Sequence, residues 1–218
     1  MNTIRGMIIM NVIDISAWQE KVDWKALKEA GVQGVILKIG ERNNLDSMFI
    51  EHVNNAVNNG FKYGVYYFSH ATTREESIEE ADTVAYWLET YLRGETPELG
   101  IWFDAEAAEM RYCDTTDICM TFLNQLTNHG HQYQGIYASW NWLSSEGAHY
   151  IKLEELPDYV PIWVAQYGSG NTFETAGKDY LKEEYPNKII RIHQFTDNLK
   201  GFGYDARSEE HTSELQSL

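Results

Sequence analysis

Short apolar runs alternate with amphipathic segments up to about residue 140, and this pattern constrains the fold more than any other feature. Capping residues and terminal glycines predict helices over 23–30, 46–59, 72–93 and 115–129, with Asp23, Asp46, Thr72 or Thr73, and Thr115 or Thr116 at their starts. The apolar runs between them predict five strands, at Met10–Ile15, Gly34–Ile39, Tyr63–Ser69, Gly100–Phe103 and Gln134–Ser139. Such alternation is typical of a parallel sheet covered by helices.

The pattern changes in the last third of the chain. Pro161–Gln166 and Ile189–Phe195 read as strands, and a last short strand includes Tyr204–Asp205, but the sequence between the first two is rich in Gly, Ser, Asn and Thr and indicates no strong helix. We therefore predict an α/β fold, an irregular TIM-like barrel with five βα units followed by three strands with few helices. An open doubly wound sheet is the alternative, although no glycine-rich phosphate loop follows the first strand.

The end of the chain differs from the rest. Arg207–Ser217 reads RSEEHTSELQS, which resembles the translation of a common sequencing-adapter oligonucleotide. We expect residues 1–206 to form a single catalytic domain and 207–218 to be a non-native tail, and we leave the tail out of the fold prediction.

Composition excludes several classes of function. The formal net charge is −16, which argues against nucleic-acid binding because phosphate contacts need a basic face. The two cysteines, Cys113 and Cys119, match no zinc or redox spacing and are interpreted as ordinary thiols. No stretch is long enough to cross a membrane, and the first residues lack the features of a signal peptide. Aromatic residues make up 13% of the chain, which suits a sugar-binding cleft or a large core about equally well.

Carboxylates lie where barrel enzymes carry their chemistry, at the carboxyl ends of strands. Asp14 ends the first predicted strand, Asp104 and Glu106 follow the fourth, and Asp205 ends the last. Aromatic and amide side chains follow the same rule and are the candidates for substrate binding: Tyr66, Phe68, Tyr137, Trp163, Tyr167 and Gln194.

Asp104 and Glu106 are two positions apart, so an extended backbone directs both side chains to one face. Two carboxyl groups in one pocket cannot both ionise cheaply, and we expect one pKa to rise. Glycoside cleavage needs such a pair, with one protonated acid and one ionised partner. An isolated Asp-x-Glu is a weak signal, and its position directly after the apolar run GIWF strengthens it.

Structural interpretations compete with the functional ones. Asp14 could cap the turn that follows it, and Asp205 could be an ordinary loop residue. Lys38 could be the buried partner of a carboxylate or a lysine whose ammonium group reaches solvent. Each of Tyr66, Tyr137 and Trp163, taken singly, suits the barrel core somewhat better than a cleft. The histidines show no metal-ligand spacing, so no metal or other cofactor is expected.

Eight blocks, in order, resemble glycoside hydrolase family 25, the Chalaropsis-type lysozymes that include many phage endolysins: VIDISAWQ, VDW, GVILKIGE, FIEHVNNAVNNGFKYGVYYFS, IWFDAE, GIYASWNWL, PIWVAQYG and IHQFTDN. The resemblance runs from about Val12 to Asp205. Two departures stand out, since Tyr67 occupies a position where many members carry His, and Arg42 follows Glu41 where Gly is usual.

The resemblance implies cleavage of the β-1,4 bond between N-acetylmuramic acid and N-acetylglucosamine in peptidoglycan, with retained anomeric configuration and no cofactor. It makes Glu106 the general acid and Asp104 its partner, either as nucleophile or as the group that orients the substrate's acetamido group. Asp14 and Asp205 correspond to supporting carboxylates. It also implies a monomer that acts on the bacterial cell wall outside the cell, in keeping with a phage enzyme made in the cytoplasm and released at lysis.

Two other functions remain open from the sequence. A catalytically inactive carbohydrate-binding barrel has no need of a proton donor, so the intact Asp104/Glu106 pair argues against it. An unrelated barrel enzyme such as a carbon–carbon lyase needs a Schiff-base lysine or a metal, and Lys38 is its only weak candidate.

Overall fold

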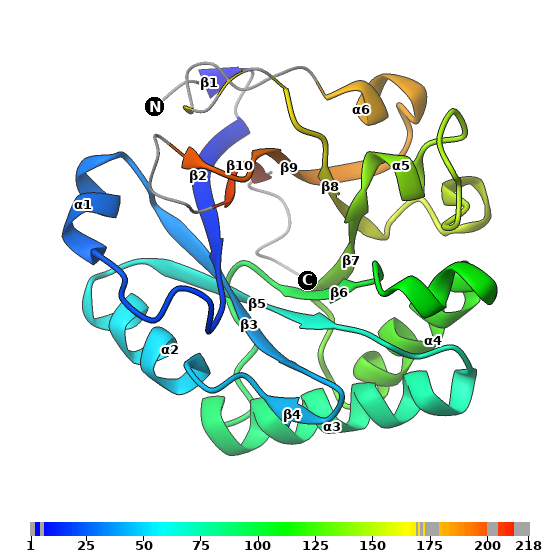
Figure 1. Ribbon diagram of the computed structural model, residues 1–218, viewed down its shortest axis with the longest axis horizontal. Helices are drawn as coiled ribbons and strands as arrows, with labels where there is room; N and C mark the ends of the chain where they lie inside the picture. Colours follow the sequence, from blue (N-terminus) through cyan, green and yellow to red (C-terminus); the bar gives the residue numbers. More distant parts are fainter. Residues whose placement is uncertain are drawn as a thin grey trace.

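The computed structural model describes residues 3–4, 7–168, 170, 172, 179–199 and 205–211, with the backbone alone for 3–9 and 205–211 within these ranges. Eight strands in this part of the chain follow one another around a barrel (Figure 1). They are β2 (Met7–Ile15), β3 (Gly34–Glu41), β5 (Lys62–Phe68), β6 (Ile101–Asp104), β7 (Gln134–Ser139), β8 (Pro161–Ala165), β9 (Ile189–Thr196) and β10 (Asp205–His211). This arrangement confirms the predicted irregular barrel.

Neighbouring strands from β2 to β9 are parallel, in the order β2, β3, β5, β6, β7, β8, β9. Strand β10 runs antiparallel to both β9 and β2 and closes the ring between them. The two-residue strands β1 (Thr3–Ile4) and β4 (Asn44–Leu45) add to the edges of β2 and β3. Asp205 was predicted to end the last strand, and this was wrong: β10 starts at Asp205 and continues into the segment that resembles a translated adapter, because it runs antiparallel between β2 and β9. The origin of that segment stays a prediction.

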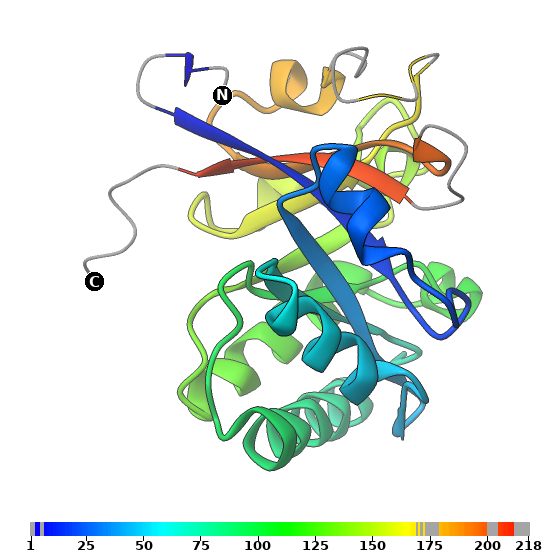
Figure 2. The same ribbon diagram turned by 90° about the vertical axis from the view of Figure 1, so that its left-hand side faces the viewer.

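Helices cover one side of the barrel. Helices α2 (Phe49–Asn58), α3 (Arg74–Leu92) and α4 (Thr115–Asn128) lie together outside the strands, whereas α1 (Trp24–Glu29) and the shorter α5 (Trp140–Leu143) and α6 (Tyr180–Glu184) lie elsewhere around it (Figure 2). The 3₁₀ turns η1 (Ala108–Tyr112) and η2 (Leu153–Glu155) lie in loops. The five-residue α6 falls in the segment where the sequence indicated no strong helix.

Most helix starts agree with the sequence. Asp23 accepts a hydrogen bond from the Ala26 amide at the start of α1, and Thr73 forms a capping box with Glu76 at the start of α3. The predicted cap of α4 was wrong: Asp114 caps it, while Thr115 donates its hydroxyl to the Met110 carbonyl. Three consecutive residues with capping side chains left the choice to tertiary contacts.

The start of α2 differs in another way. Its cap residue Met48 makes no side-chain hydrogen bond, and Asp46 acts from two residues earlier. One Asp46 oxygen accepts from the Met48 amide at 3.0 Å and the other from the Ala17 amide at 3.0 Å. Asp46 therefore joins the start of α2 to the turn that follows β2.

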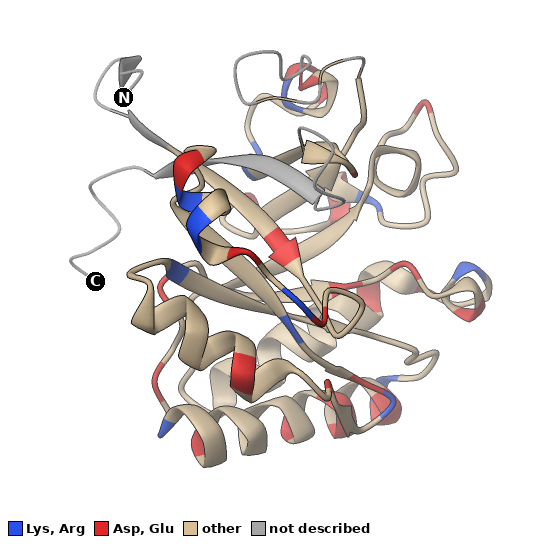
Figure 3. Ribbon diagram, turned by 60° about the vertical axis from the view of Figure 1, so that its left-hand side comes forward, with Lys and Arg blue, Asp and Glu red and all other residues tan. Residues whose placement is uncertain are grey.

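The core has two layers. The larger one lies between the sheet and the helices, and a smaller one fills the barrel with Met10, Val12, Ile36, Leu99, Trp102, Trp163 and Ile192. A filled interior is typical of small barrels and leaves chemistry to the strand ends. Acidic residues are spread over helices and loops, with fewer basic residues among them (Figure 3). No described helix is long and apolar enough to span a membrane, and both Cys113 and Cys119 are free thiols.

Candidate active site

The alternation of side chains along the strands brings the candidate carboxylates to the inside of the barrel. Val12 and Trp102 belong to the cluster that fills the barrel, and Asp14 and Asp104 each lie two positions further along the same strands. Side chains at i and i+2 share a face, so both carboxylates lie above the filled interior, at the carboxyl end of the sheet.

Glu106 lies on the same side as Asp104. The Ala105 amide still donates to the Tyr137 carbonyl at 3.1 Å, so the ladder with β7 extends one residue past β6. Oε1 of Glu106 accepts a hydrogen bond from the Ser139 amide at 2.9 Å, at the end of β7. This contact fixes one oxygen of a half-buried carboxyl group, and no described residue bonds the other oxygen.

Asp104 is almost completely enclosed. Its residue is 6% exposed, and its Oδ1 has no hydrogen-bond partner among the described residues. Burial and, after it, the negative charge of Glu106 raise the pKa of Asp104 well above its usual range, against smaller effects of the Glu106 amide and Lys38. The pair therefore keeps one proton to a higher pH than an isolated carboxyl group does. The carboxyl group with the raised pKa is therefore that of Asp104, whereas the family resemblance assigns the role of proton donor to Glu106.

The other carboxylates lie on neighbouring strands. Half-buried Asp14 is the penultimate residue of β2, and its backbone pairs with that of Asp205 across the antiparallel β2–β10 ladder. The Asp205 side chain lies outside the described part of the structure. The turn after Asp14 is held by other groups, since Gln19 Oε1 accepts from the Ser16 amide at 2.9 Å and Asp46 binds Ala17.

Lys38 lies two positions beyond the interior residue Ile36 and is bound mainly to Glu41. Its Nζ lies 2.7 Å from Glu41 Oε2, its side chain is 14% exposed, and it stands 5.4 Å from the centre of the Phe68 ring. It is thus a partner of a carboxylate, one of the two interpretations that the sequence left open.

The aromatic candidates form a layer below and beside Asp104. Phe68 and Tyr137 are its direct neighbours in register on β5 and β7, and both are half-buried. Half-buried Tyr66 contacts Trp163 edge-on at 6.2 Å, and Tyr137 contacts it at 4.3 Å. Trp163 is only 1% exposed, so it forms a floor beneath the two tyrosines.

Gln194 is completely buried and links two aromatic residues. It accepts from Trp163 Nε1 at 3.2 Å and donates to the Tyr167 hydroxyl at 2.8 Å. Tyr167 itself is 52% exposed. Gln194 is therefore shielded from solvent and orients the exposed Tyr167 through this hydrogen bond.

Trp18 was not among the candidates from the sequence. It follows Asp14 by four residues, in the turn that Gln19 and Asp46 hold, and it is 90% exposed. Its spacing from a strand-end carboxylate was visible in the sequence, but its exposure was not. An indole displayed on a fixed turn after β2 offers a flat apolar surface to a ligand.

The two departures from the family pattern lie away from Asp104. Tyr67 is fully buried in the outer layer, against Trp87 and Phe122. Arg42 adopts a φ of +47°, a conformation that favours glycine, and its guanidinium lies 3.2 Å from Glu109. Among the described residues, no group of three or more His, Cys, Asp or Glu side chains is arranged to hold a metal.

Comparisons with known proteins identify the family of the chain and solved structures with a similar fold. The sequence model of Glycosyl hydrolases family 25 matches residues 13–203. The fold is similar to the autolysin LytC of Streptococcus pneumoniae, solved with a synthetic peptidoglycan ligand, at 22% identity and a TM-score of 0.70 over 93% of this chain. This chain covers 47% of the length of that autolysin.

Two shorter proteins match over nearly their whole length. They are the catalytic domain of endolysin ply40 from bacteriophage P40 of Listeria monocytogenes and a muramidase from Trichobolus zukalii, each with 19% identity, a TM-score of 0.71 and 95% of this chain covered. The covered shares of those two structures are 95% and 96%. No curated protein sequence matches the chain.

Proposed function

Because the chain belongs to Glycosyl hydrolases family 25, we propose that it is a lysozyme-type muramidase that cleaves the β-1,4 bond between N-acetylmuramic acid and N-acetylglucosamine in peptidoglycan. The observation that carries the proposal is the Asp104/Glu106 pair, held on one side of β6 at the open end of a filled barrel. The solved neighbours named as an autolysin, an endolysin and a muramidase support the same substrate and action on the cell wall.

Glu106 acts as the general acid in this proposal. Its Oε1 is held by the Ser139 amide, so Oε2 remains available to the oxygen of the leaving sugar. The Glu106 proton passes to that oxygen as the glycosidic bond breaks, and the anomeric carbon bonds to Asp104 or to the acetamido oxygen of the substrate. A water molecule then displaces this bond and gives its proton back to Glu106. Because Glu106 is the less buried member of the pair, it is the one that a substrate reaches.

Asp104 acts as the partner of Glu106. The pair retains one proton, and burial favours that proton on Asp104 in the free protein. Proton donation by Glu106 therefore requires that this proton lie on Glu106, and that Asp104 be ionised, once substrate is bound. Asp104 then acts either as the nucleophile or as the acceptor of a hydrogen bond that orients the acetamido group of the substrate. By the resemblance to the family, Asp14 and Asp205 supply further negative charge where positive charge develops on the sugar.

Some of the candidate binding residues contact the sugar directly, and others hold those residues in place. Phe68, Tyr66 and Tyr137 line the floor beside Asp104, and the exposed Tyr167 and Trp18 extend the sugar-binding surface on the loops after β8 and β2. Trp163 and Gln194 are buried and act through the residues that they touch, Tyr137 and Tyr167.

The chemistry of the newly formed chain ends tests this proposal. Purified bacterial walls are incubated with the wild type or with Glu106→Gln, and the products are reduced with borohydride. The proposal predicts muramitol ends from the wild type alone. Glucosaminitol ends would show that a different bond is cut. An absence of new ends from the wild type would contradict hydrolysis and favour a carbohydrate-binding protein.

A further inference from the structure

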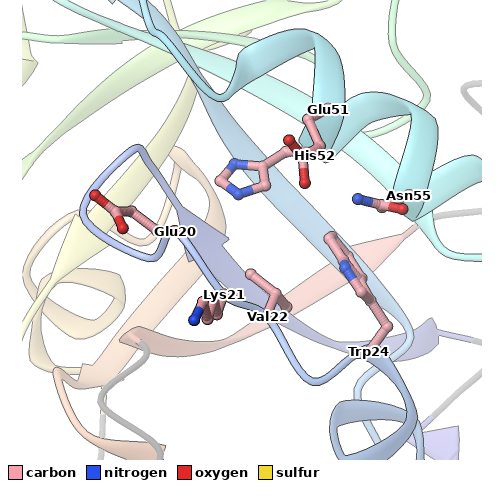
Figure 4. Close-up of a pocket in the computed structure, with 7 residues that line it drawn as sticks. All are labelled: Glu20, Lys21, Val22, Trp24, Glu51, His52 and Asn55. Atoms are coloured by element: carbon pink, nitrogen blue, oxygen red, sulfur yellow. The ribbon is translucent and has the colours of Figure 1, made fainter.

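A cavity of about 250 Å³ lies outside the barrel, between the loop that joins β2 to α1 and helix α2 (Figure 4). Glu51, His52 and Asn55 of α2 line one side, and loop residues with the first residue of α1 line the other: Glu20, Lys21, Val22 and Trp24. None of the carboxylates of the candidate active site lines it.

The walls of this cavity are fixed by contacts that need no ligand. His52 is 2% exposed, and its Nε2 lies 3.2 Å from the Gln19 carbonyl, which joins α2 to the loop. The Trp24 ring contacts His52 at 6.4 Å and Phe61 at 5.7 Å. A site formed before binding loses less entropy when it binds a ligand.

The lining combines a flat ring with polar groups. Trp24 is half-buried and presents part of its indole to the cavity, while Glu20 and Asn55 make no side-chain hydrogen bond to any described residue. An aromatic surface with a few polar groups is the usual composition of a small-molecule site. The volume is below the roughly 300–1,000 Å³ of sites for drug-sized ligands, and it suits a single ring.

The charge of the residues that line the cavity indicates which class of ligand it can bind. The lining carries two carboxylates and one ammonium group, and burial lowers the pKa of His52, which keeps that imidazole neutral near pH 7. An anionic group such as a phosphate would meet a net negative surface. A neutral sugar avoids this repulsion and uses the carboxylates and the Asn55 amide as hydrogen-bond partners for its hydroxyl and acetamido groups.

We propose that this cavity is a second carbohydrate site that binds one N-acetylglucosamine unit of a glycan strand, stacked on Trp24 and hydrogen-bonded by Asn55. The inference rests on the proposed function for the identity of the polymer. The loop that forms the cavity begins directly after Asp14 and Ile15, so the site lies beside the open end of the barrel. It binds a segment of the polymer that is not being cleaved.

Two tryptophan signals distinguish the sites. The Glu106→Gln protein is labelled with ¹⁵N, and the indole N–H signals of Trp24 and Trp163 are followed while N,N′,N″-triacetylchitotriose is added. Trp163 reports on the floor of the active site, because its Nε1 is bonded to Gln194. Substitution of each tryptophan by phenylalanine assigns the two signals.

The inference predicts that both signals move with saturation. Movement of Trp163 alone would overturn the second site and leave the proposed function standing. Movement of Trp24 alone would support the second site and contradict sugar binding at the carboxylates. If neither moved, both proposals would fail.

A matched pair of variants on α2 tests the contact itself. Asn55→Ala removes the amide that lines the cavity, and it should weaken binding measured at Trp24 about tenfold, the effect of losing one hydrogen bond. Asn54→Ala makes the same change on the neighbouring residue, which does not line this cavity, and should alter binding by less than about twofold. Equal weakening by both variants would contradict the role of Asn55.

Discussion

At Asp104, burial, an unbonded oxygen and a negative neighbour all act against ionisation of the same carboxyl group. The folded protein therefore holds the Asp104 proton more tightly than the unfolded chain, whose Asp pKa is about 3.9. Between the unfolded and the folded pKa the native state binds more protons, so stability falls as pH rises through this window. The arrangement suits a functional site, where stability is often exchanged for reactivity.

Asp104→Asn should stabilise the protein at neutral pH. The amide cannot ionise, so the variant escapes the loss that the wild type suffers above pH 4. We expect its Tm at pH 7 to exceed that of the wild type by at least about 2–4 °C, the shift that ~1 kcal/mol produces in a domain of this size. Thermal unfolding from pH 4 to pH 8 measures this. The gap should narrow toward pH 4, and a gap that widens there would contradict the assigned pKa direction.

Trp18 is expected to contribute to wall binding without contributing to stability. Trp18→Ala should leave stability unchanged, because the side chain is 90% exposed, but it should weaken binding of the Glu106→Gln protein to walls. We expect a loss of about fivefold to tenfold, which corresponds to ~1–1.4 kcal/mol. Co-sedimentation with walls measures the affinity. Tyr86→Ala, at a 65% exposed position on α3, is the matched control, and equal losses in both variants would argue against a specific contact.

At the scale of elements, hydrophobic periodicity and caps predicted most of the barrel. The strand Gln134–Ser139 was predicted to the residue, and Gly31 and Gly60 end their helices at the expected places with positive φ. Contacts distant in sequence were beyond such patterns. The sequence alone did not reveal that Lys38 pairs with Glu41, or that Gln194 lies buried between Trp163 and Tyr167.

The cap of α4 gives a test at this scale. Asp114→Ala leaves the amide of Asp117 without its acceptor and should cost about 1 kcal/mol, or ~2–4 °C in Tm. Asp114→Asn retains a capping oxygen and should restore most of the loss. Calorimetry of the three proteins measures the difference. If the asparagine variant were as unstable as the alanine variant, the cap would not be the cause.

The whole molecule combines a closed ring of strands with a strongly negative surface. The eight main strands, their closure into a barrel and the strand ends at Asp14 and Asp104 were predicted from sequence. The antiparallel direction of β10, which starts at Asp205, was not, because pairing partners leave no periodic signal. Likewise, sequence placed Asp104 and Glu106 on one face and predicted one raised pKa. It could not say which residue would carry it, because that depends on burial.

The net charge of −16 predicts an effect of salt on the attack of intact walls. Wall polymers are anionic, so repulsion should slow association at low ionic strength. Raising salt from about 0.01 M to about 0.15 M shortens the screening length from ~30 Å to ~8 Å and should increase the initial rate on walls. Hydrolysis of a short uncharged oligosaccharide should change little. A rate on walls that falls over this range would contradict the argument.

Hydrolysis by this mechanism depends most on Glu106 as the proton donor, and the initial rate of wall hydrolysis by Glu106→Gln tests this role most directly. General acid catalysis contributes about 10²- to 10⁴-fold, so the variant should lose at least about a hundredfold in rate while its Tm stays close to that of the wild type. Glu79→Gln makes the same change on the exposed face of α3 and should retain full activity. A folded Glu106→Gln protein that degrades walls at the wild-type rate would contradict the account.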